Sequence, residues 1–196
     1  GPTAKAAEIE SSKVFSKSLM NKYGIPTAEH KVFDDTEKAV NYINTLDPPI
    51  VVKADGLALG KGVIIASCRE DAEDAVRNMI SGQSFGIAGK RVIIEEFLEG
   101  KELTVLAFTD GYTIRAMPNS RDHKKAMDDD KGLNTGGMGA ICPGEYLTES
   151  DWEELYNEIF LPTIKAMRKE GRPFEGVIYF GLMLTSKGPK VIEYNA

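Results

Sequence analysis

The sequence predicts an α+β fold, built from amphipathic helices and antiparallel strand pairs. Apolar residues at helical spacing are interspersed with short β-branched runs that end in tight turns. The sequence lacks the steady alternation of strand and helix that a doubly wound parallel sheet requires, and it lacks any repeat of fixed period. A chain of 196 residues is long enough for one domain of ordinary size or two small ones.

The first two helices are predicted in the N-terminal quarter of the chain. Apolar residues recur at helical spacing over residues 15–23, and Gly24 ends this helix. The second helix covers residues 36–46 and follows acidic residues, which favour the positive end of its dipole. Pro48 and Pro49 stop it.

Capping-box patterns indicate where two further helices start. Ser67 with Glu70 precedes one apolar helix face, and Ser150 with Glu153 precedes another. Pro162 lies inside the later helix and is predicted to kink it, because proline cannot donate a backbone hydrogen bond.

Strands are expected where β-branched and aromatic residues cluster between turns. These segments are residues 50–54, 63–65, 91–97, 103–108, 112–117, 177–184 and 190–194. The Thr-Asp-Gly turn at residues 109–111 predicts an antiparallel hairpin. Residues 118–144 are polar, rich in glycine and without periodicity, so they predict a long functional loop.

Composition and charge exclude several classes of protein. With 24 basic and 30 acidic side chains the formal net charge is −6, so a broad positive field for nucleic acid is absent. No apolar run approaches the roughly 18 residues that a membrane-spanning helix needs. The chain opens without a secretory pattern and without Met, which indicates a processed or excised piece of a longer protein.

The cysteines and histidines narrow the chemistry further. Cys68 and Cys142 lie far apart in the sequence without a second pair, which excludes a disulfide framework and fits a reducing cytoplasm. His30 and His123 are too few and too scattered for a His-based metal site or a Ser-His-Asp relay.

The glycine-rich segment at residues 51–63 is similar to a phosphate loop, because glycines surround Lys61 between two strands. It differs from a Walker A loop, since only three residues separate Gly56 from Gly60 and Gly62 replaces the Ser or Thr. A flexible hairpin lid over a nucleotide fits this spacing. A surface hairpin with a charged tip fits it equally well.

The last strand ends in Glu193-Tyr194-Asn195, and period-2 alternation places the Glu193 carboxylate and the Asn195 amide on one face. Two adjacent oxygen donors suit the magnesium of a bound nucleotide, which takes one or two ligands from the protein. A solvated face of an edge strand is the alternative interpretation.

Two other patterns have equally plain alternatives. Residues 95–102 combine carboxylates with an apolar pair at a strand end, which fits either an adenine frame or an ordinary hairpin. The glycines of residues 134–139 fit an anion-binding nest or a simple turn.

Taken in order, these segments resemble the ATP-grasp domain of the phosphoribosylamine–glycine ligase family, also called glycinamide ribonucleotide synthetases. The Asp-His-Lys string at residues 122–124 and the Asn-Thr-Gly-Gly-Met-Gly string at 134–139 are its most specific features. The other matching strings lie at residues 24–28, 51–63, 92–98, 181–184 and 188–193.

The resemblance implies an ATP-grasp fold, in which two α+β subdomains hold a nucleotide between them. Residues 1–30 would form an N-terminal helix joining the larger subdomain, 31–96 the small lid, and 97–196 the rest of the larger subdomain. The family's N-terminal and C-terminal domains are absent from this sequence. We therefore expect nucleotide binding without ligation from this chain alone.

The resemblance also assigns roles to individual residues. Lys13 and Lys53 would reach the ATP phosphates, and the lid loop with Gly60, Lys61 and Gly62 would close over them. Glu95, Phe97 and Leu98 would frame the adenine, and Glu102 would bind the ribose. Lys125 and Asn134 would lie near the phosphates, and Asp122 and Lys124 near the acceptor substrates. Glu193 and Asn195 would bind Mg²⁺ or Mn²⁺. Lys61 and Asn134 are the residues that the resemblance connects with catalysis.

The implied reaction joins glycine to 5-phosphoribosylamine with ATP, through glycyl phosphate, in cytoplasmic de novo purine biosynthesis. No side-chain nucleophile is needed, since phosphoryl transfer depends mainly on cations that hold developing charge. The parent protein would be free-standing or fused to other purine-pathway enzymes.

One departure from the family pattern is Lys125, which replaces the usual Arg and loses its bidentate fork. Many other ATP-grasp enzymes have a further acidic metal ligand on the strand before the final Glu-x-Asn, and residues 181–183 offer none, as in this ligase family. Another ATP-grasp carboxylate–amine ligase, or a non-catalytic nucleotide-binding or interaction module, would share some of these features. We also expect Lys53→Ala to weaken ATP binding through lost charge and to leave thermal stability nearly intact.

Overall fold

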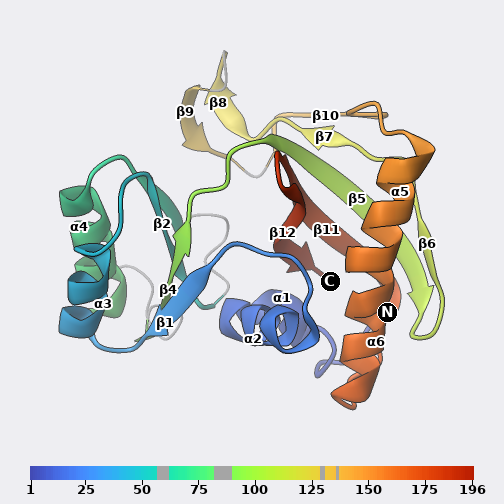
Figure 1. Cartoon of the computed structure of the whole chain (residues 1–196), viewed down its shortest axis with the longest axis horizontal. Coiled ribbons are helices and arrows are strands. Elements are labelled where there is room, and N and C mark those ends of the chain that lie inside the picture. Colours follow the sequence, from blue (N-terminus) through green and yellow to red (C-terminus); the bar gives the residue numbers. More distant parts are fainter. Residues whose placement is uncertain (57–61, 82–89, 129–130, 136) are drawn as a thin grey trace. The chain divides into compact units, whose positions relative to one another are not determined.

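The computed structural model describes residues 1–56, 62–81, 90–128, 131–135 and 137–196 (Figure 1). Its contacts divide the chain into two units. The large unit contains Gly1–Glu10, Phe15–Thr27 and Glu99–Ala196, and the small unit contains Ser11–Val14 and Ala28–Leu98. Each unit combines helices with an antiparallel sheet, which confirms the predicted α+β class.

The small unit is built on a four-stranded antiparallel sheet with the order β1-β4-β2-β3. The strands are β1 His30–Phe33, β2 Ile50–Ala54, β3 Val63–Ala66 and β4 Val92–Glu96. Helices α3 Thr36–Ile43 and α4 Arg69–Ile80 lie side by side against this sheet (Figure 1). Their apolar faces form one core with alternate residues of the central strands, including Val52 and Ile94.

The large unit has a second antiparallel sheet, with the order β12-β11-β5-β6. Its strands are β5 Lys101–Asp110, β6 Ile114–Ala116, β11 Glu175–Thr185 and β12 Gly188–Asn195. The helical elements are α1 Glu8–Ser11, α2 Lys13–Tyr23, α5 Glu149–Leu155, the π-helical turn η2 Tyr156–Phe160 and α6 Leu161–Lys169.

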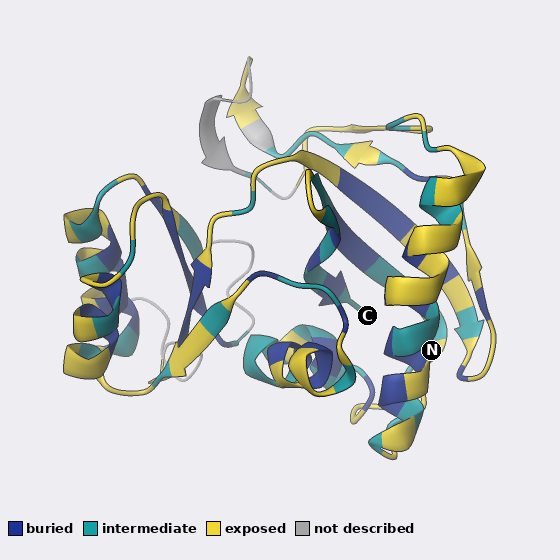
Figure 2. Ribbon diagram, in the orientation of Figure 1, coloured by how far each residue is buried: buried dark blue, intermediate teal, exposed yellow. Residues whose placement is uncertain are grey.

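One face of the large sheet forms the core of this unit together with the helices. Leu103 and Val105 of β5 and Phe180 and Leu182 of β11 are fully buried there. Figure 2 shows these buried stretches along both strands. Because side chains alternate along a strand, the intervening residues lie on the opposite face, which carries polar groups.

Both predicted capping boxes need correction. The N-cap of α4 is Cys68 without a side-chain hydrogen bond, and the Ser67 hydroxyl donates to Asp71 instead. In α5 the reciprocal box joins Thr148 to Asp151, two residues before the predicted one. Overlapping Ser, Thr and acidic residues satisfy the same pattern in more than one frame, so the pattern alone does not place the first helical turn.

Pro162, which the sequence predicts to kink its helix, is preceded by a π-helical turn. The Leu161 N–H donates to the Tyr156 carbonyl five residues earlier, which defines the π-helical turn before α6. Proline has no backbone N–H, so the continuous helical run of α5, the π-helical turn and α6 lacks one hydrogen bond at this point.

The long loop predicted for residues 118–144 is wrong, because the segment contains four short strands. They are β7 Arg121–Asp122, β8 Lys125–Met127, β9 Lys131–Asn134 and β10 Ala140–Ile141. β7 pairs with β10, and β8 pairs with β9. Strands of two to four residues are held by backbone hydrogen bonds and are too short to show an alternating pattern.

None of the described helices is both long and apolar enough to span a bilayer. Cys68 and Cys142 are free thiols, as the sequence predicted.

Candidate functional site

Three charged side chains gather on the polar face of the large sheet. Glu102 comes from β5, Glu193 from β12, and Lys124 from the residues that follow β7. The Lys124 ammonium lies 2.8 Å from Glu102 Oε1 and 4.0 Å from Glu193 Oε1. The three side chains are between 29% and 44% exposed, so the cluster is accessible to solvent. We call these residues the open cluster.

Lys124 stays protonated at neutral pH. Burial by itself lowers the pKa of Lys124, but the hydrogen bond to Glu102 and the charges of Glu102 and Glu193 outweigh it and hold that pKa above its ordinary value. The open cluster therefore combines one fixed positive charge with two carboxylates.

Tyr179 and Gly181 of β11 complete the floor of the open cluster. The Tyr179 hydroxyl lies 3.1 Å from Thr104 Oγ1, and burial raises the pKa of Tyr179. A Cβ on Gly181 would lie 3.2 Å from both Glu193 Cγ and Tyr179 Cε1, so a larger residue would crowd both side chains. Neither residue carries a role that was predicted from the sequence, although strand alternation places both on the polar face.

The predicted metal pair has the expected geometry. Tyr194 is buried in the core, whereas Glu193 and Asn195 are partly exposed on the polar face. A β-bulge adds one residue to β12 between the pairs Gly181–Glu193 and Leu182–Val191. Bulges re-aim the side chains that follow them. The described residues contain no group of three or more His, Cys, Asp or Glu that would hold a metal ion by itself.

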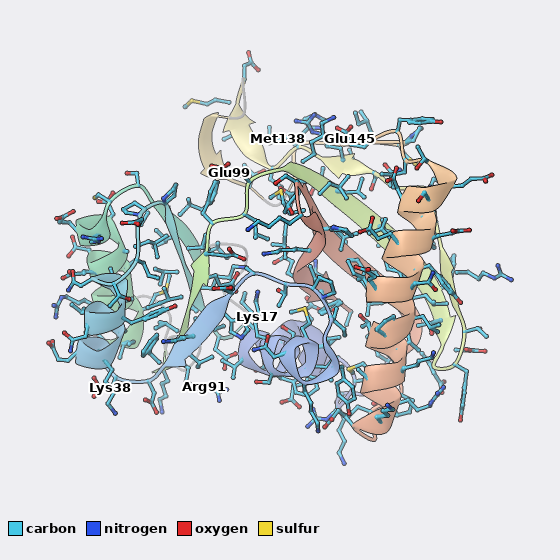
Figure 3. All side chains as sticks on the ribbon, in the orientation of Figure 1. Lys17, Lys38, Arg91, Glu99, Met138 and Glu145 are labelled. Carbon is cyan, nitrogen blue, oxygen red and sulfur yellow. The ribbon has the colours of Figure 1, made fainter. Side chains whose placement is uncertain are left out.

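The strand that carries Glu193 and Asn195 is anchored on both sides of these two residues. Before the pair, Thr27 Oγ1 donates to the Val191 carbonyl over 2.8 Å and accepts from the buried Lys17 ammonium over 2.7 Å. After the pair, the Ala196 N–H donates to Glu10 over 2.8 Å. Figure 3 marks Lys17 on α2. Thr27 and Val191 lie in two of the strings that match the family, at residues 24–28 and 188–193, but no individual role was predicted for any of these anchors.

The small unit has its own charged pair on the face of its sheet opposite the helices. Lys53 and Glu95 alternate with the core residues Val52 and Ile94, and they form an ion pair of 2.9 Å between Nζ and Oε2. Their side chains are only 7% and 3% exposed. We call them the buried pair.

Lys13 also belongs to the small unit, although it begins α2. Its ammonium donates to the Gly56 carbonyl over 3.2 Å, directly before residues 57–61 in the sequence. Gly62 accepts from the Ala54 N–H on the other side of that segment. The structure therefore places Lys13 at the start of the glycine-rich segment.

The remaining predicted residues are distributed as follows. Phe97 and Leu98 follow β4 in the small unit, and Asp122 in the large unit lies beside Gly137, where a Cβ would be 3.4 Å from its carboxylate. Lys125 and Asn134 face each other as a backbone pair of β8 and β9. Gly60, Lys61 and the side chains of Lys125 and Asn134 lie outside the described residues.

Comparison with known proteins identifies a family match over residues 11–196, described as "Phosphoribosylglycinamide synthetase, ATP-grasp (A) domain". A phosphoribosylamine–glycine ligase of Streptococcus pneumoniae is 52% identical over 196 residues, which are 100% of this chain and 47% of that protein. A trifunctional purine biosynthetic protein adenosine-3 of Gallus gallus is 50% identical over the whole chain, which corresponds to 20% of its length.

A solved structure has the same fold. The crystal structure of a phosphoribosylamine–glycine ligase from Thermotoga maritima matches with a TM-score of 0.93 and 40% identity, over 100% of this chain and 50% of that one. The chain thus spans about half the length of the single-function relatives that it matches.

Proposed function

The chain belongs to the phosphoribosylglycinamide synthetase ATP-grasp (A) domain family, and from this premise we propose that it binds ATP with magnesium. The whole protein would then join glycine to 5-phosphoribosylamine in purine biosynthesis, in the cytoplasm. The observation that carries the proposal is the open cluster, whose two carboxylates and lysine share one sheet face with the Asn195 amide.

The residues of the large unit fit a nucleotide-bound magnesium or manganese ion. Glu193 and Asn195 supply hard oxygen donors two residues apart, and Mg²⁺ takes few ligands from the protein when phosphates and water provide the others. When bound, the metal supplies charge neutralisation to the phosphate oxygens. Glu102 carries a second carboxylate at the same place and accepts hydrogen bonds, which suits ribose hydroxyls.

The residues of the small unit supply positive charge and a site for the base. Lys13 and Lys53 would hold phosphate oxygens, with Lys61 and the glycines beside it closing over them. Glu95, Phe97 and Leu98 would frame the adenine. In this proposal residues 31–96 form the lid, and residues 1–30 and 97–196 form the larger subdomain. The small unit of the structure has slightly wider bounds than this lid, because it also includes Ser11–Val14 and runs from Ala28 to Leu98.

The proposed reaction has two steps. The glycine carboxylate attacks the γ-phosphorus of ATP, the bond to ADP breaks, and glycyl phosphate forms. The amine of 5-phosphoribosylamine then attacks the acyl carbon, expels phosphate, and loses a proton as the amide forms. Asp122 and Lys124 would hold the acceptor substrates, and Lys125 and Asn134 would stabilise the transferring phosphoryl group.

Calorimetric titration tests the nucleotide-binding proposal. We expect the chain to bind ATP more tightly with Mg²⁺ than without it, and we expect Glu193→Gln to remove this magnesium dependence. Glu153→Gln is the matched control, because Glu153 is exposed on α5 and belongs to no proposed site. Absence of binding at millimolar MgATP would contradict the proposal.

A second measurement separates binding from ligation. Incubation of the chain with ATP, glycine and 5-phosphoribosylamine should give no glycinamide ribonucleotide, whereas a protein of the relatives' full length should produce it. Product formed by the chain alone would show that the remaining half of the relatives is not needed.

A further inference from the structure

Asp55 makes several polar contacts at the start of the segment before residues 57–61, and no role has been assigned to it above. It follows β2 directly and its carboxylate is nearly buried. Asp55 Oδ1 accepts from the Val14 N–H over 2.8 Å and from the Ser12 hydroxyl over 3.0 Å. Its other oxygen, Oδ2, pairs with the Arg91 guanidinium. All of these residues belong to the small unit.

The backbone of Asp55 makes two further hydrogen bonds to the same part of the small unit. Its carbonyl accepts from the Lys13 N–H over 3.1 Å, and its N–H donates to the Arg91 carbonyl over 3.1 Å. Arg91 directly precedes β4, and Figure 3 marks it there. One residue therefore ties the start of α2 to the ends of two strands.

Through these contacts Asp55 caps the N-terminus of α2, although Asp55 and Val14 are 41 residues apart in the sequence. Val14 is in the first turn of α2, where backbone N–H groups have no partner within the helix. A carboxylate at this end satisfies such a donor and interacts favourably with the helix dipole. Ser12 precedes the helix in the capping position, and its hydroxyl donates to the same carboxylate oxygen that accepts from the Val14 N–H.

The consequence concerns Lys13, which lies between the two residues that Asp55 holds. With its backbone tied to Asp55 and its ammonium 3.2 Å from the Gly56 carbonyl, Lys13 is fixed at both ends against the start of the glycine-rich segment. Without the Asp55 carboxylate, the residues on both sides of Lys13 lose a hydrogen-bond acceptor, so the ammonium would sample more positions although the Asp55 carbonyl still accepts from the Lys13 N–H.

We propose that Asp55 is a positioning residue of the nucleotide site, which caps α2 so that the Lys13 ammonium meets the phosphates beside the glycine-rich segment. This inference rests on the proposed ATP binding, and it adds a residue that touches no phosphate itself. Arg91 and Ser12 support this role, because both donate hydrogen bonds to the Asp55 carboxylate and hold it in place.

The test compares ATP with adenosine, which lacks the phosphates. We expect Asp55→Ala to weaken MgATP binding about tenfold, the size expected for a lost charged hydrogen bond, and to leave adenosine binding unchanged. Lys13→Ala should have a similar effect, and the double variant should be no weaker than either single variant, because both act on the same ammonium. Glu37→Ala, which removes an exposed ion pair with Arg77 in the same unit, should change neither affinity.

Ser12→Ala keeps the test decisive if Asp55→Ala does not fold. It removes one hydrogen bond to Asp55 and should weaken MgATP binding about threefold. Full ATP affinity in these variants, an equal loss of adenosine binding, or additive effects of Asp55→Ala and Lys13→Ala would each overturn the inference. Wild-type chain that binds neither ligand would contradict the proposed function instead, so the two failures are distinguishable.

Discussion

The buried pair of the small unit and the open cluster of the large unit use the same chemistry in opposite surroundings. Lys53 and Glu95 are almost wholly removed from water, whereas Lys124, Glu102 and Glu193 remain partly exposed. Both place a lysine ammonium less than 3 Å from a carboxylate. Because of this difference in exposure, we expect the fold to depend on the buried pair, whereas the residues of the open cluster can exchange partners.

Solvent explains this difference. Removing one partner of a buried ion pair leaves a charge in a medium that solvates it poorly, which is strongly destabilising. In a solvated cluster water replaces the lost partner, so stability hardly changes. A ligand that has to displace a lysine ammonium from its carboxylate should therefore bind more easily at the open cluster than at the buried pair.

The largest expected effect is on the stability of the small unit. Lys53→Met should reduce its free energy of unfolding by about 3 kcal/mol, because it removes one charge of a buried ion pair. This replaces the sequence-based expectation that the residue can be substituted without loss of stability. Amide hydrogen exchange of β2 and β4 measures the effect, since the single tryptophan, Trp152, lies in the large unit.

Two variants sharpen this prediction. Lys53→Met combined with Glu95→Gln should regain much of the stability, because both charges are then gone. Lys38→Met removes an exposed lysine of α3 and should leave hydrogen exchange within experimental error. Equal losses for Lys53→Met and Lys38→Met would mean that burial does not distinguish the two regions.

A smaller effect is expected for metal binding at the open cluster. Lys124→Met should tighten Mn²⁺ binding in the absence of nucleotide about threefold to fivefold, since one unit charge at this distance in a water-like dielectric is worth about 1 kcal/mol. The free energy of unfolding should fall by less than about 1 kcal/mol. Electron paramagnetic resonance of free Mn²⁺ measures the affinity.

Lys101→Met provides the matched control in the same unit. Its ammonium pairs with Glu145 at a largely exposed position outside the open cluster, so Mn²⁺ affinity should stay unchanged. Weaker Mn²⁺ binding in Lys124→Met would indicate that Lys124 supports the metal pair rather than competing with the ion.

The smallest expected effect is the acid sensitivity of α5. Hydrogen bonds from the Thr148 backbone and hydroxyl hold the pKa of Asp151 below its ordinary value. Asp151 therefore stabilises the fold above the unfolded pKa of about 3.9, and this contribution is lost as the pH falls through the lower folded value. Asp151→Asn should be less stable than wild type by a constant amount between pH 5 and 8, and the difference should begin to shrink only below about pH 4 and vanish below the lowered folded pKa.

Trp152 fluorescence during denaturation at each pH measures this difference, because Trp152 is adjacent to the capping box. A difference that persists unchanged down to the lowest pH would exclude the Asp151 carboxylate as its source. Amide hydrogen exchange of the small unit should be the same in Asp151→Asn and wild type. This control shows whether each measurement reports on one unit only.

Local sequence signals predicted most of the elements, but not their exact starts. The strand at Ile50–Ala54 and the helix at Thr36–Ile43 were identified from composition and periodicity. The start of α5 at Thr148 was missed because two overlapping capping patterns compete, and the short strands of residues 118–144 carry no periodic signal.

Of the candidate site, the sequence indicated which residue types would carry charge, but not which of them would be buried. Alternation along β12 was enough to place Glu193 and Asn195 on one face, because that period is a property of the strand itself. Lys53, by contrast, was expected to be free to contact phosphate, and its pairing with Glu95 follows from the neighbouring strands β2 and β4.

The sequence alone determined the α+β class, the order of most helices and strands, and the family to which the chain belongs, because short-range periodicity and contiguous motifs record these properties. Only the tertiary structure decided that Asp55 caps α2 and that Lys124 meets Glu102 and Glu193. These contacts join residues separated by 22 to 69 positions, and their formation depends on sheet register and burial, which no local pattern encodes.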